Sequence, residues 1–352
     1  MKIACLTTSP AENAKLEETA RKHGHTFRFI HPSKTLQYIS EHERGLDRFY
    51  IASEGDEPER IYSKDIDVVI PRLGSGVEYG SSVLRFMVEN LGAWCPNNPW
   101  GHVFASNKAY TLQKLSSVGV KVPKTIITES PQHVQWIVDK IKLPVIVKTW
   151  NGSKGKTVGI CDSKRSANSL FAFAFNAGLK ILLEEYVESG GTDYRVWVVG
   201  DKVAVAMKRS SVDKNDFRAN ISQGGKGEKV ELSKEDQDLC IKAAHSIGLN
   251  VAGVDLMKNS ETGQSYIIEI NSNPGVKIID ITGHNPFEDI LDFCEANYKK
   301  GTTGGVTAIQ GNYLPDLLTS GDFMCGLVEL LKSDRISKEM FKIFFEAYEN
   351  KV

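Results

Sequence analysis

The sequence lacks three features that would narrow its class at once: paired cysteines, a long apolar run and a large net charge. Its six cysteines are scattered and form no C-x-x-C pair, which favours reduced thiols and a cytoplasmic protein. No stretch approaches the roughly 18 apolar residues of a membrane helix, and the opening MKIACLTTSP predicts a strand rather than a signal peptide. The formal net charge of -1 gives no electrostatic case for nucleic acid or an anionic membrane as partner.

The eight histidines show no H-E-x-x-H or similar spacing, so zinc chemistry is not expected. Hydrophobic residues make up 41% of the chain and charged residues 25%, as in ordinary globular proteins. With 352 residues the chain is long enough for two or three modest domains.

The first 104 or so residues alternate strand and helix patterns, which indicates an open, largely parallel α/β unit. The charged, poorly periodic residues 40–65 are expected to be a surface excursion. The elements expected in this unit are strands at Lys2–Leu6, Thr26–Ile30 and Asp67–Ile70 and helices at Glu12–His23 and Ser81–Leu91.

Two apolar runs, Val251–Met257 and Ser265–Asn271, are joined by a polar segment and predict a β-hairpin. The loop length places Asp255 opposite Glu269, and Asn271 shares the face of Glu269 because side chains alternate along a strand. Three oxygen ligands without His or Cys suit Mg²⁺ or Mn²⁺ rather than Zn²⁺. The alternative is an amphipathic hairpin whose acids are merely solvated.

The segment Trp150–Thr157, WNGSKGKT, lies between two expected strands, Pro144–Lys148 and Val158–Cys161. Its GKT ending is not a P-loop, because the first glycine is missing and a strand rather than a helix follows. The interpretation is a mobile glycine-rich flap that closes over phosphates; the alternative is a floppy surface hairpin.

Several further side chains are ambiguous from sequence alone. Arg72, just past a strand end, either clamps a substrate carboxylate or is a surface arginine. Lys108, in the first turn of a helix over Ser106–Val118, opposes the helix dipole and is either held by an anionic group or solvated. Glu184 and Glu185 are adjacent on the strand Lys180–Val187 and therefore point to opposite faces, so they form no acid/base dyad.

Donors near the middle of the chain, Arg209, Arg218 and Asn220, lie on what the sequence predicts to be an irregular loop, where they bind substrate or are solvated. His245 is expected to be packed or exposed rather than a catalytic base. A further N-cap at Ser130-Pro131 predicts a helix to Ile141.

These motifs, taken in order, resemble the RimK-type ATP-grasp carboxylate–amine ligases over roughly residues 1–295. The matching segments are MKIA, IPRLG, the helix of Lys108, PVIVK with its glycine flap, EEYV, DYRVWVVGD, DFRAN, GVD and EINSNPG. The resemblance implies an α/β ATP-grasp fold with an N-terminal open α/β pre-ATP-grasp domain, three subdomains in all, and ATP gripped between the last two.

The resemblance also implies roles for individual residues. Two Mg²⁺ ions, or Mn²⁺, would bind Asp255, Glu269 and Asn271, and the catalytic side chains would be Arg218 and Lys148. The substrate side would comprise Arg72, Arg209 and Asn273. The ATP-binding set would be Lys108, Lys148, Gly152, Ser153, Gly155, Glu184, Glu185, Tyr186, Val187, Asp193, Arg218 and Asn220.

The implied domains are residues 1–104 (pre-ATP-grasp), 105–188 (small lid and central subdomain), 189–298 (metal and nucleotide subdomain) and 299–352 (linker and helical tail). The sequence departs from the family where Glu184 stands in place of a frequent glutamine and in the loop between Arg209 and Asp216. The tail, with helices expected at Phe323–Leu331 and Lys338–Glu349, has no counterpart. The resemblance also implies a dimer or tetramer.

The leading hypothesis is an ADP-forming ligase that adds glutamate, or another amino acid, to the C-terminal carboxylate of a peptide or protein through an acylphosphate. The alternatives are a ligase on a small metabolite or cofactor, an ATP-grasp kinase with a hydroxyl acceptor, and a non-catalytic ATP-binding module.

Overall fold

The structure is a computed structural model of the whole chain. The chain divides into two compact units, Met1–Gly305 and Val306–Val352, and all the described residues belong to the first. The described ranges are 1–39, 48–54, 57–74, 77–130, 132–150, 158–211 and 226–298. The two helices expected in the tail therefore lie outside the described residues.

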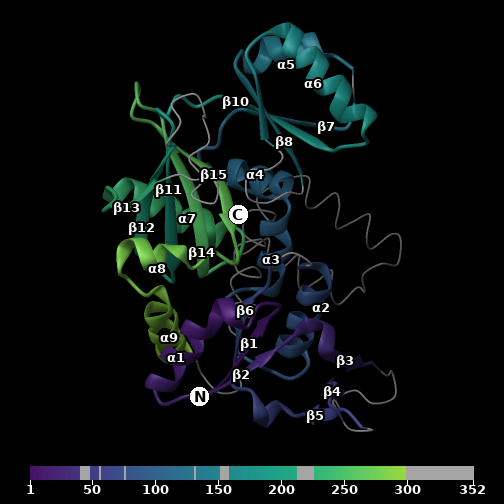
Figure 1. The fold of residues 1–352 in the computed structure, drawn as a ribbon, viewed down its shortest axis with the longest axis vertical. Coiled ribbons are helices and arrows are strands. Elements are labelled where there is room, and N and C mark those ends of the chain that lie inside the picture. The colour runs from purple at the N-terminus through teal and green to yellow at the C-terminus, as the bar shows by residue number, and fades with distance from the viewer. Residues whose placement is uncertain are drawn as a thin grey trace, which may run out of the picture. The chain divides into compact units, whose positions relative to one another are not determined.

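The N-terminal region is built on a parallel sheet in the order β2-β1-β6, as the alternation of patterns predicts (Figure 1). The expected helices form, and Gly24 and Gly92 follow them with positive φ angles, which a glycine adopts without strain. The elements are β1 (Lys2–Thr7), η1 (Ala11–Asn13), α1 (Ala14–Lys22), β2 (Thr26–Ile30), β6 (Val68–Arg72) and α2 (Val77–Glu89).

The segment 40–65, expected to be a surface excursion, contains two short strands where it is described. A small antiparallel sheet in the order β3-β4-β5 occupies this part of the chain. Its strands are too short to show a clear periodicity. They are β3 (Thr35–Tyr38), β4 (Arg48–Ile51) and β5 (Glu59–Ile61), with η2 (Pro32–Lys34) and η4 (Ser63–Asp65) beside them.

The predicted lysine helix is the second of two helices separated by Asn107. Asn98 and Asn107 cap them, each accepting hydrogen bonds from backbone N–H groups of the first turn. The two helices are α3 (Pro99–Ser106) and α4 (Lys108–Ser117), so Lys108 is the first residue of α4.

A second sheet, antiparallel in the order β7-β10-β8-β9, carries α5 and α6 on one face (Figure 1). Helix α5 begins later than predicted, after His133, and Pro131 lies outside the described residues. Phe173 of α6 is 67% exposed, so not all of that helix's aromatic residues pack in the core. The elements are β7 (Thr125–Thr128), α5 (Val134–Ile141), β8 (Val145–Thr149), β9 (Val158–Cys161), α6 (Lys164–Asn176) and β10 (Ile181–Glu185).

A third sheet has the order β13-β12-β11-β14-β15 and packs one face on α7. Gly200-Asp201 forms a tight turn between β11 and β12, and the Ser233 side chain caps α7 by accepting a hydrogen bond from the Asp236 N–H. The elements are β11 (Thr192–Val199), β12 (Lys202–Ser210), β13 (Lys226–Lys229), α7 (Lys234–Ser246), β14 (Val251–Lys258) and β15 (Ser265–Asn271).

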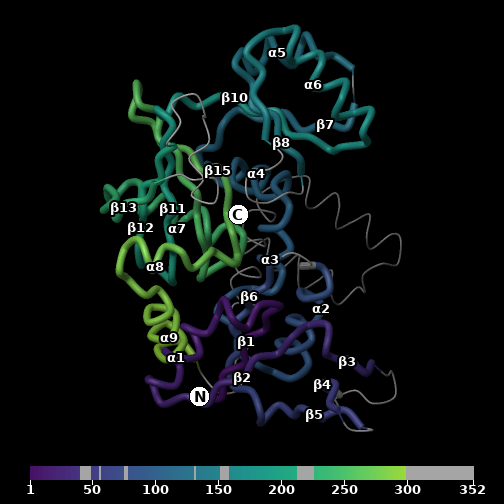
Figure 2. The backbone as a smooth tube through the Cα atoms, viewed as in Figure 1, coloured from purple at the N-terminus to yellow at the C-terminus, as the bar shows by residue number. Residues whose placement is uncertain are grey.

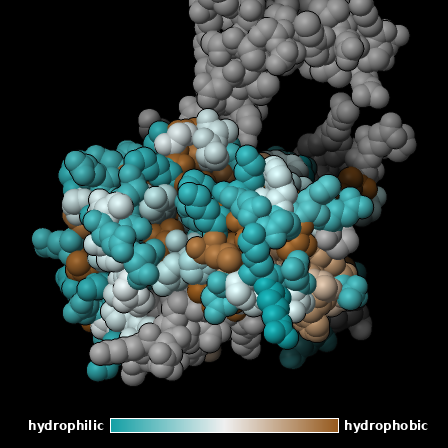
Figure 3. Space-filling view, turned by 90° about the horizontal axis from the view of Figure 1, so that it is seen from above, coloured by the Kyte–Doolittle hydropathy of each residue, from teal (hydrophilic) through white to brown (hydrophobic). Residues whose placement is uncertain are grey.

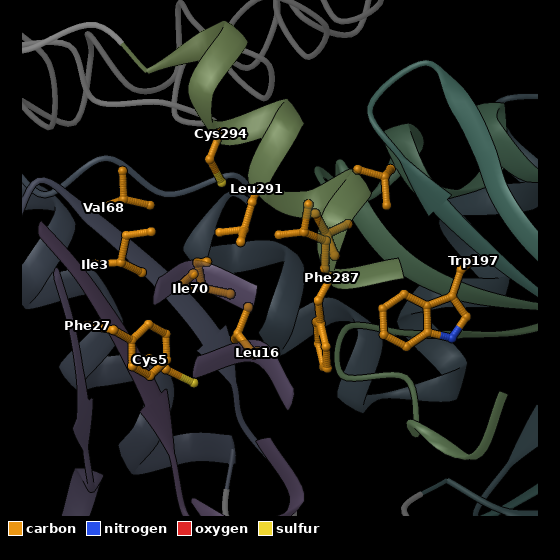
Figure 4. Packing of buried hydrophobic residues seen from close by; sticks show 14 of the residues in the cluster. Ile3, Cys5, Leu16, Phe27, Val68, Ile70, Trp197, Phe287, Leu291 and Cys294 are labelled. Atoms are coloured by element: carbon orange, nitrogen blue, oxygen red, sulfur yellow. The ribbon is translucent and has the colours of Figure 1, made fainter. Parts of the chain in front are cut away.

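Helices α8 (Lys277–Thr282) and α9 (Pro286–Asn297) return the chain to its beginning. Figure 2 shows the yellow-green α9 beside the purple α1, and the two helices are in contact. Figure 4 shows Phe287 and Leu291 of α9 between residues of the N-terminal sheet and Trp197 of β11. One hydrophobic core therefore joins the N-terminal sheet to the third sheet.

The surface seen from above is mostly hydrophilic, with small hydrophobic areas between polar side chains (Figure 3). None of the described helices combines the length and the apolar character that crossing a membrane requires.

Candidate functional site

The third sheet has one face whose two ends differ in chemistry. Alternate residues of β11 share this face, and its first half carries Asp193 and Arg195 whereas its second half carries Trp197 and Val199. Trp197 and Val199 lie in the core that joins the N-terminal sheet to α9. The charged half continues the same face beyond this core, so the apolar packing holds a set of charged side chains in fixed positions.

The hairpin β14–β15 has the predicted register. Asp255 pairs directly with Glu269, and Gly253 pairs with Asn271. The three expected oxygen ligands therefore lie on one face, two on neighbouring strands and two at alternate positions of β15. A β-bulge between Asp255 and Leu256 leaves Ile268 of β15 as an extra residue, so Ile267 and Ile270, three residues apart, both reach the core beneath α7.

Asp255 is buried and held by two arginines. Arg195, directly opposite on β11, donates hydrogen bonds from Nε to Oδ1 and from Nη2 to Oδ2, and Arg209 Nη2 lies 3.2 Å from Oδ2. Burial alone would raise the pKa of Asp255, but the two guanidinium groups outweigh it and lower the pKa. Asp255 is therefore an anion at neutral pH and can coordinate a cation through its remaining lone pairs.

Arg209 bridges two carboxylates. It donates from Nε to Asp193 Oδ1 at 2.5 Å and from Nη2 to Asp193 Oδ2 at 2.8 Å, in addition to its contact with Asp255. The expectation that Arg209 lies on an irregular loop is wrong: it is buried in β12, opposite Asp193 on β11. Burial and the nearby charge of Asp255 together raise the pKa of Asp193, although Arg209 opposes this shift.

Lys108 is held by an anionic group, which was one of the two predicted possibilities. Its Nζ lies 3.3 Å from Oε1 of Glu269. The cap at Asn107 fixes the start of α4 and so directs Lys108 toward the hairpin. Three cations, Lys108, Arg195 and Arg209, thus face three carboxylates, those of Asp193, Asp255 and Glu269.

The end of β15 and the turn after it carry two buried polar atoms that have no hydrogen-bond partner among the described residues, Nδ2 of Asn271 and Oδ1 of Asn273. Pro274 follows and packs on Gly253, where an added Cβ would lie 2.5 Å from the Pro274 Cβ. Buried orphan atoms cost free energy, so their presence beside the carboxylates indicates a ligand site.

Arg72 is buried at the end of β6 and is not a surface arginine. It donates from Nε to Asn13 Oδ1 at 2.8 Å and from Nη2 to the Pro274 carbonyl oxygen at 2.9 Å. Its Nη1 has no partner in the described part of the chain. Burial lowers the pKa of Arg72 to about 10, so the guanidinium stays charged at neutral pH and holds the turn that follows the hairpin.

The second sheet presents Lys148 and Glu184 on the face opposite its helices. They form an ion pair that is largely buried, and Leu182, on the same face as both, packs against Ala109 and Leu112 of α4. The pair therefore lies on the side of the sheet that meets the helix of Lys108. Glu184 and Glu185 point to opposite faces, as predicted.

The neighbouring residues of the strand β10 are engaged differently. Glu185 Oε1 accepts a hydrogen bond from the Lys124 backbone N–H at 2.9 Å, and Oε2 lies 3.2 Å from Lys124 Nζ. The Tyr186 N–H donates to the Pro144 carbonyl oxygen, and Val187 is buried. His245 Nε2 lies 3.0 Å from the Gly200 carbonyl oxygen, which agrees with the packed role expected for it.

Five predicted site residues, Gly152, Ser153, Gly155, Arg218 and Asn220, lie outside the described residues. Conversely, sequence reasoning did not single out Arg195. Its signal was available, because an arginine two residues after an aspartate in an otherwise apolar strand predicts a charged end to one face.

Comparison with known proteins identifies the class that this fold and site define. Residues 105–293 match the family described as the RimK-like ATP-grasp domain. The chain belongs to the RimK-like ATP-grasp family, and the predicted fold and the predicted class of ATP-grasp ligase are confirmed.

The chain is 33% identical over 286 residues to a probable alpha-L-glutamate ligase of Haemophilus influenzae (strain PittEE), covering 80% of this chain and 94% of that protein. It is also 33% identical over 305 residues to a probable alpha-L-glutamate ligase of Legionella pneumophila (strain Corby), covering 85% and 97%.

Among solved structures, the fold is similar to the ATP-grasp ligase PsnB complexed with a phosphomimetic precursor variant, Mg and ADP. The TM-score is 0.65 at 17% identity, over 85% of this chain and 99% of that chain. The macrocyclase MdnC of Microcystis aeruginosa MRC, bound to its precursor peptide MdnA, gives a TM-score of 0.63 at 14% identity, over 85% and 100%.

Proposed function

We propose that this protein is an ATP- and Mg²⁺-dependent ligase that joins glutamate, or a similar amino acid, to a carboxylate of a peptide or protein. The observation that carries the proposal is the direct pairing of Asp255 with Glu269 on the charged end of a buried sheet face. The charged groups are held rigidly and in balance, which is the arrangement that positions a metal–nucleotide complex.

The residues present fit Mg²⁺. Asp255, Glu269 and Asn271 offer oxygen donors on one face, as a hard cation requires. The orphaned Nδ2 of Asn271 is an N–H donor, which suits a phosphate oxygen rather than the cation itself. When bound, Mg²⁺ neutralises charge that develops on the phosphates. Mn²⁺ suits the same donors.

Lys108 and Lys148 take the phosphates of ATP, and their present carboxylate partners, Glu269 and Glu184, release them when a triphosphate arrives. Adenine and ribose bind along β10 and the residues after it, with Asp193 nearby. The remaining residues of this proposed nucleotide site are Gly152, Ser153, Gly155, Glu184, Glu185, Tyr186, Val187, Arg218 and Asn220.

The substrate lies beside the turn after β15. Asn273 has an unpartnered buried oxygen and Arg72 an unpartnered Nη1 in the described part of the chain, so each retains a polar group for a ligand. Arg209 is placed on the substrate side of the site and holds the carboxylates of Asp193 and Asp255 through ion pairs. The relatives named as alpha-L-glutamate ligases support glutamate, and the neighbours solved with precursor peptides support a peptide acceptor.

The reaction has two steps. The γ-phosphoryl group passes to the acceptor carboxylate and gives an acylphosphate and ADP. The amine then attacks the carbonyl carbon, the phosphate leaves, and an amide forms with loss of a proton from the amine. Lys148 and Arg218 offset negative charge during the transfer, and burial of the site limits hydrolysis of the acylphosphate.

Two broader features belong to the same proposal. The described cysteines, Cys5, Cys95, Cys161, Cys240 and Cys294, are free and buried, which supports a cytoplasmic protein with reduced thiols. A dimer or tetramer is proposed on family resemblance alone.

The test incubates the purified full-length protein with ATP, Mg²⁺, glutamate and a panel of peptides, and measures ADP release and the mass of the products. The expected result is ADP formed together with a gain of one or more glutamyl residues on a peptide. A gain of phosphate would indicate a kinase, a product limited to small carboxylates would indicate a metabolite ligase, and absence of ADP formation would indicate a binding module; each would overturn the proposal.

A matched pair of variants distinguishes the site from the fold. Glu269→Gln removes the proposed metal ligand, and Glu261→Gln changes an exposed glutamate in the turn of the same hairpin. Turnover should be lost in the first and kept in the second. Equal activity in both would remove Glu269 from the mechanism.

A further inference from the structure

A second cluster of metal-ligating side chains lies where the corner between α1 and β2 meets α9. His23 is the C-cap residue of α1, and His25 immediately precedes β2. Gly24 between them has a φ of 77°, which lets the two histidines turn toward the same side. Glu288 and Glu295 lie seven residues apart on α9, so they share one face of that helix.

The contacts in the cluster converge on one carboxylate oxygen. Glu295 Oε1 lies 3.0 Å from His23 Nδ1 and 2.8 Å from His25 Nε2. The second nitrogen of His23, Nε2, lies 2.6 Å from Glu288 Oε2. One ligand atom from each of His23, His25 and Glu295 lies within 4.8 Å of the others.

We propose that His23, His25 and Glu295 bind a divalent transition-metal ion of the Zn²⁺ type, with water completing a four-coordinate site. Zn–N and Zn–O bonds of about 2.0–2.2 Å place neighbouring ligand atoms about 3.3 Å apart in a tetrahedron. The two histidine–glutamate separations are already near this value. The His23 side chain is 21% exposed and that of His25 9%, whereas Glu295 is 41% exposed, so the carboxylate adjusts most freely and the rings need only small rotations about their side-chain bonds.

Glu288 supplies an independent reason to favour a metal. A ligating histidine usually hydrogen-bonds a carboxylate through its other ring nitrogen, which fixes its tautomer and orientation. Glu288 occupies that position on His23, so the cluster has both the ligands and the outer partner of a metal site. The donor set of two imidazoles and one carboxylate suits Zn²⁺, Co²⁺ or Ni²⁺ better than Mg²⁺.

This site is separate in sequence and chemistry from the proposed ligase site, which uses oxygen donors on β14 and β15. Its role is structural: one ion would tie the start of the N-terminal sheet to the last described helix, 272 residues away in sequence. The spacing of histidines along the chain did not indicate zinc, because the two glutamates of the cluster, Glu288 and Glu295, come from α9, near the other end of the described chain.

The test titrates the full-length protein with Co²⁺ in excess Mg²⁺, which occupies oxygen-donor sites, and follows the visible ligand-field absorption. Four-coordinate Co²⁺ absorbs much more strongly than the six-coordinate ion of an oxygen site. The wild type should develop the strong band, and Zn²⁺ should remove it. His25→Ala and Glu295→Gln should each weaken binding at least about tenfold.

Two control variants make the result specific. His284→Ala removes another histidine that lies 2.6 Å from a carboxylate, Asp289, and should leave the band unchanged. Glu269→Gln should abolish ligation and also leave the band unchanged, so failure of this inference is distinct from failure of the proposed function. Zn²⁺ should raise the melting temperature of the wild type and not that of His25→Ala.

Two outcomes would overturn the assignment. One is absence of the four-coordinate band in the wild type at any Co²⁺ concentration that the protein tolerates. The other is an unchanged band in both His25→Ala and Glu295→Gln, which would place the ion elsewhere in the chain.

Discussion

Arg72 donates a hydrogen bond from Nη2 to the carbonyl oxygen of Pro274, 202 residues later in the sequence, at a distance of 2.9 Å. Its guanidinium lies over the rings of Trp197 and Phe287, and it forms no ion pair within the described part of the chain. A buried charge without a counter-ion lowers stability. We therefore assign Arg72 a positioning role: it holds the turn that follows β15 through the Pro274 carbonyl oxygen.

The first prediction concerns this contact. Arg72→Lys keeps the charge but cannot reach both Asn13 and Pro274. The turn after β15 should become less ordered, and kcat should fall about tenfold to hundredfold because the side chains that hold the metal–nucleotide complex are displaced. Steady-state kinetics check this, with the exposed Arg85→Lys as control. Wild-type kcat in Arg72→Lys would show that the turn does not need this contact.

Gly253→Ala tests the same turn from the opposite side. Its Cβ would lie 2.5 Å from Pro274 Cβ, so either the strand or the turn must shift, at a cost of about 1–3 kcal/mol in stability. Gly275→Ala, at the residue directly after Pro274, meets no atom within 4 Å and serves as control. We expect lower activity and a lower melting temperature for the first variant only. Similar values for the two variants would contradict the close packing of Pro274 on β14.

The balance of charge in the site predicts how metal binds. Three cations already neutralise Asp193, Asp255 and Glu269, so Mg²⁺ alone meets little net attraction, whereas Mg²⁺ with a triphosphate brings its own counter-charge. Titration calorimetry should show Mg²⁺ binding at least about tenfold more tightly, or about 1.4 kcal/mol, with a non-hydrolysable ATP analogue than without it. Equal affinity in both conditions would contradict this picture of the site.

Asp236 gives a pH dependence with a definite sign. Burial alone would raise its pKa, but hydrogen bonds from Ser265, Lys258 and Ser233 outweigh it and lower the pKa. The contribution to stability is therefore fully present above the unfolded value of about 3.9 and is lost as the pH falls toward the folded value. Urea unfolding of the wild type and Asp236→Asn should differ most above about pH 5 and converge below about pH 4. If the difference in free energy of unfolding between the two proteins stayed constant from above about pH 5 to below about pH 4, the lowered pKa assigned to Asp236 would be contradicted.

The hairpin was predictable from sequence because its register depends on local quantities: alternation along each strand and the length of the loop. These predicted that Asp255 faces Glu269, but in the structure the pairing also depends on the β-bulge between Asp255 and Leu256, because the register next to the loop would otherwise place Ile268 opposite Asp255. An anionic partner of Lys108 was one of two alternatives from sequence, because a lysine at a helix N-terminus opposes the dipole, and the structure decides between them.

The rest depends on contacts between distant parts of the chain. The sequence around Arg209 resembles a loop, and only the structure shows that its charge is balanced by Asp193 and Asp255. Arg195 likewise pairs with Asp255, which lies 60 residues away in the sequence. Arg72 and Pro274, or His23 and Glu295, meet only after the hydrophobic core has brought α9 back to the N-terminal sheet. The short strands β3, β4 and β5 are set by pairing with each other rather than by their own periodicity.

The most direct test of the central claim is electron paramagnetic resonance of Mn²⁺ bound with a non-hydrolysable ATP analogue. The wild type and Glu261→Gln should bind two Mn²⁺ per nucleotide, and Asp255→Asn and Glu269→Gln should each bind fewer. Unchanged Mn²⁺ binding in both of these variants would contradict the claim that this hairpin holds the metal–nucleotide complex.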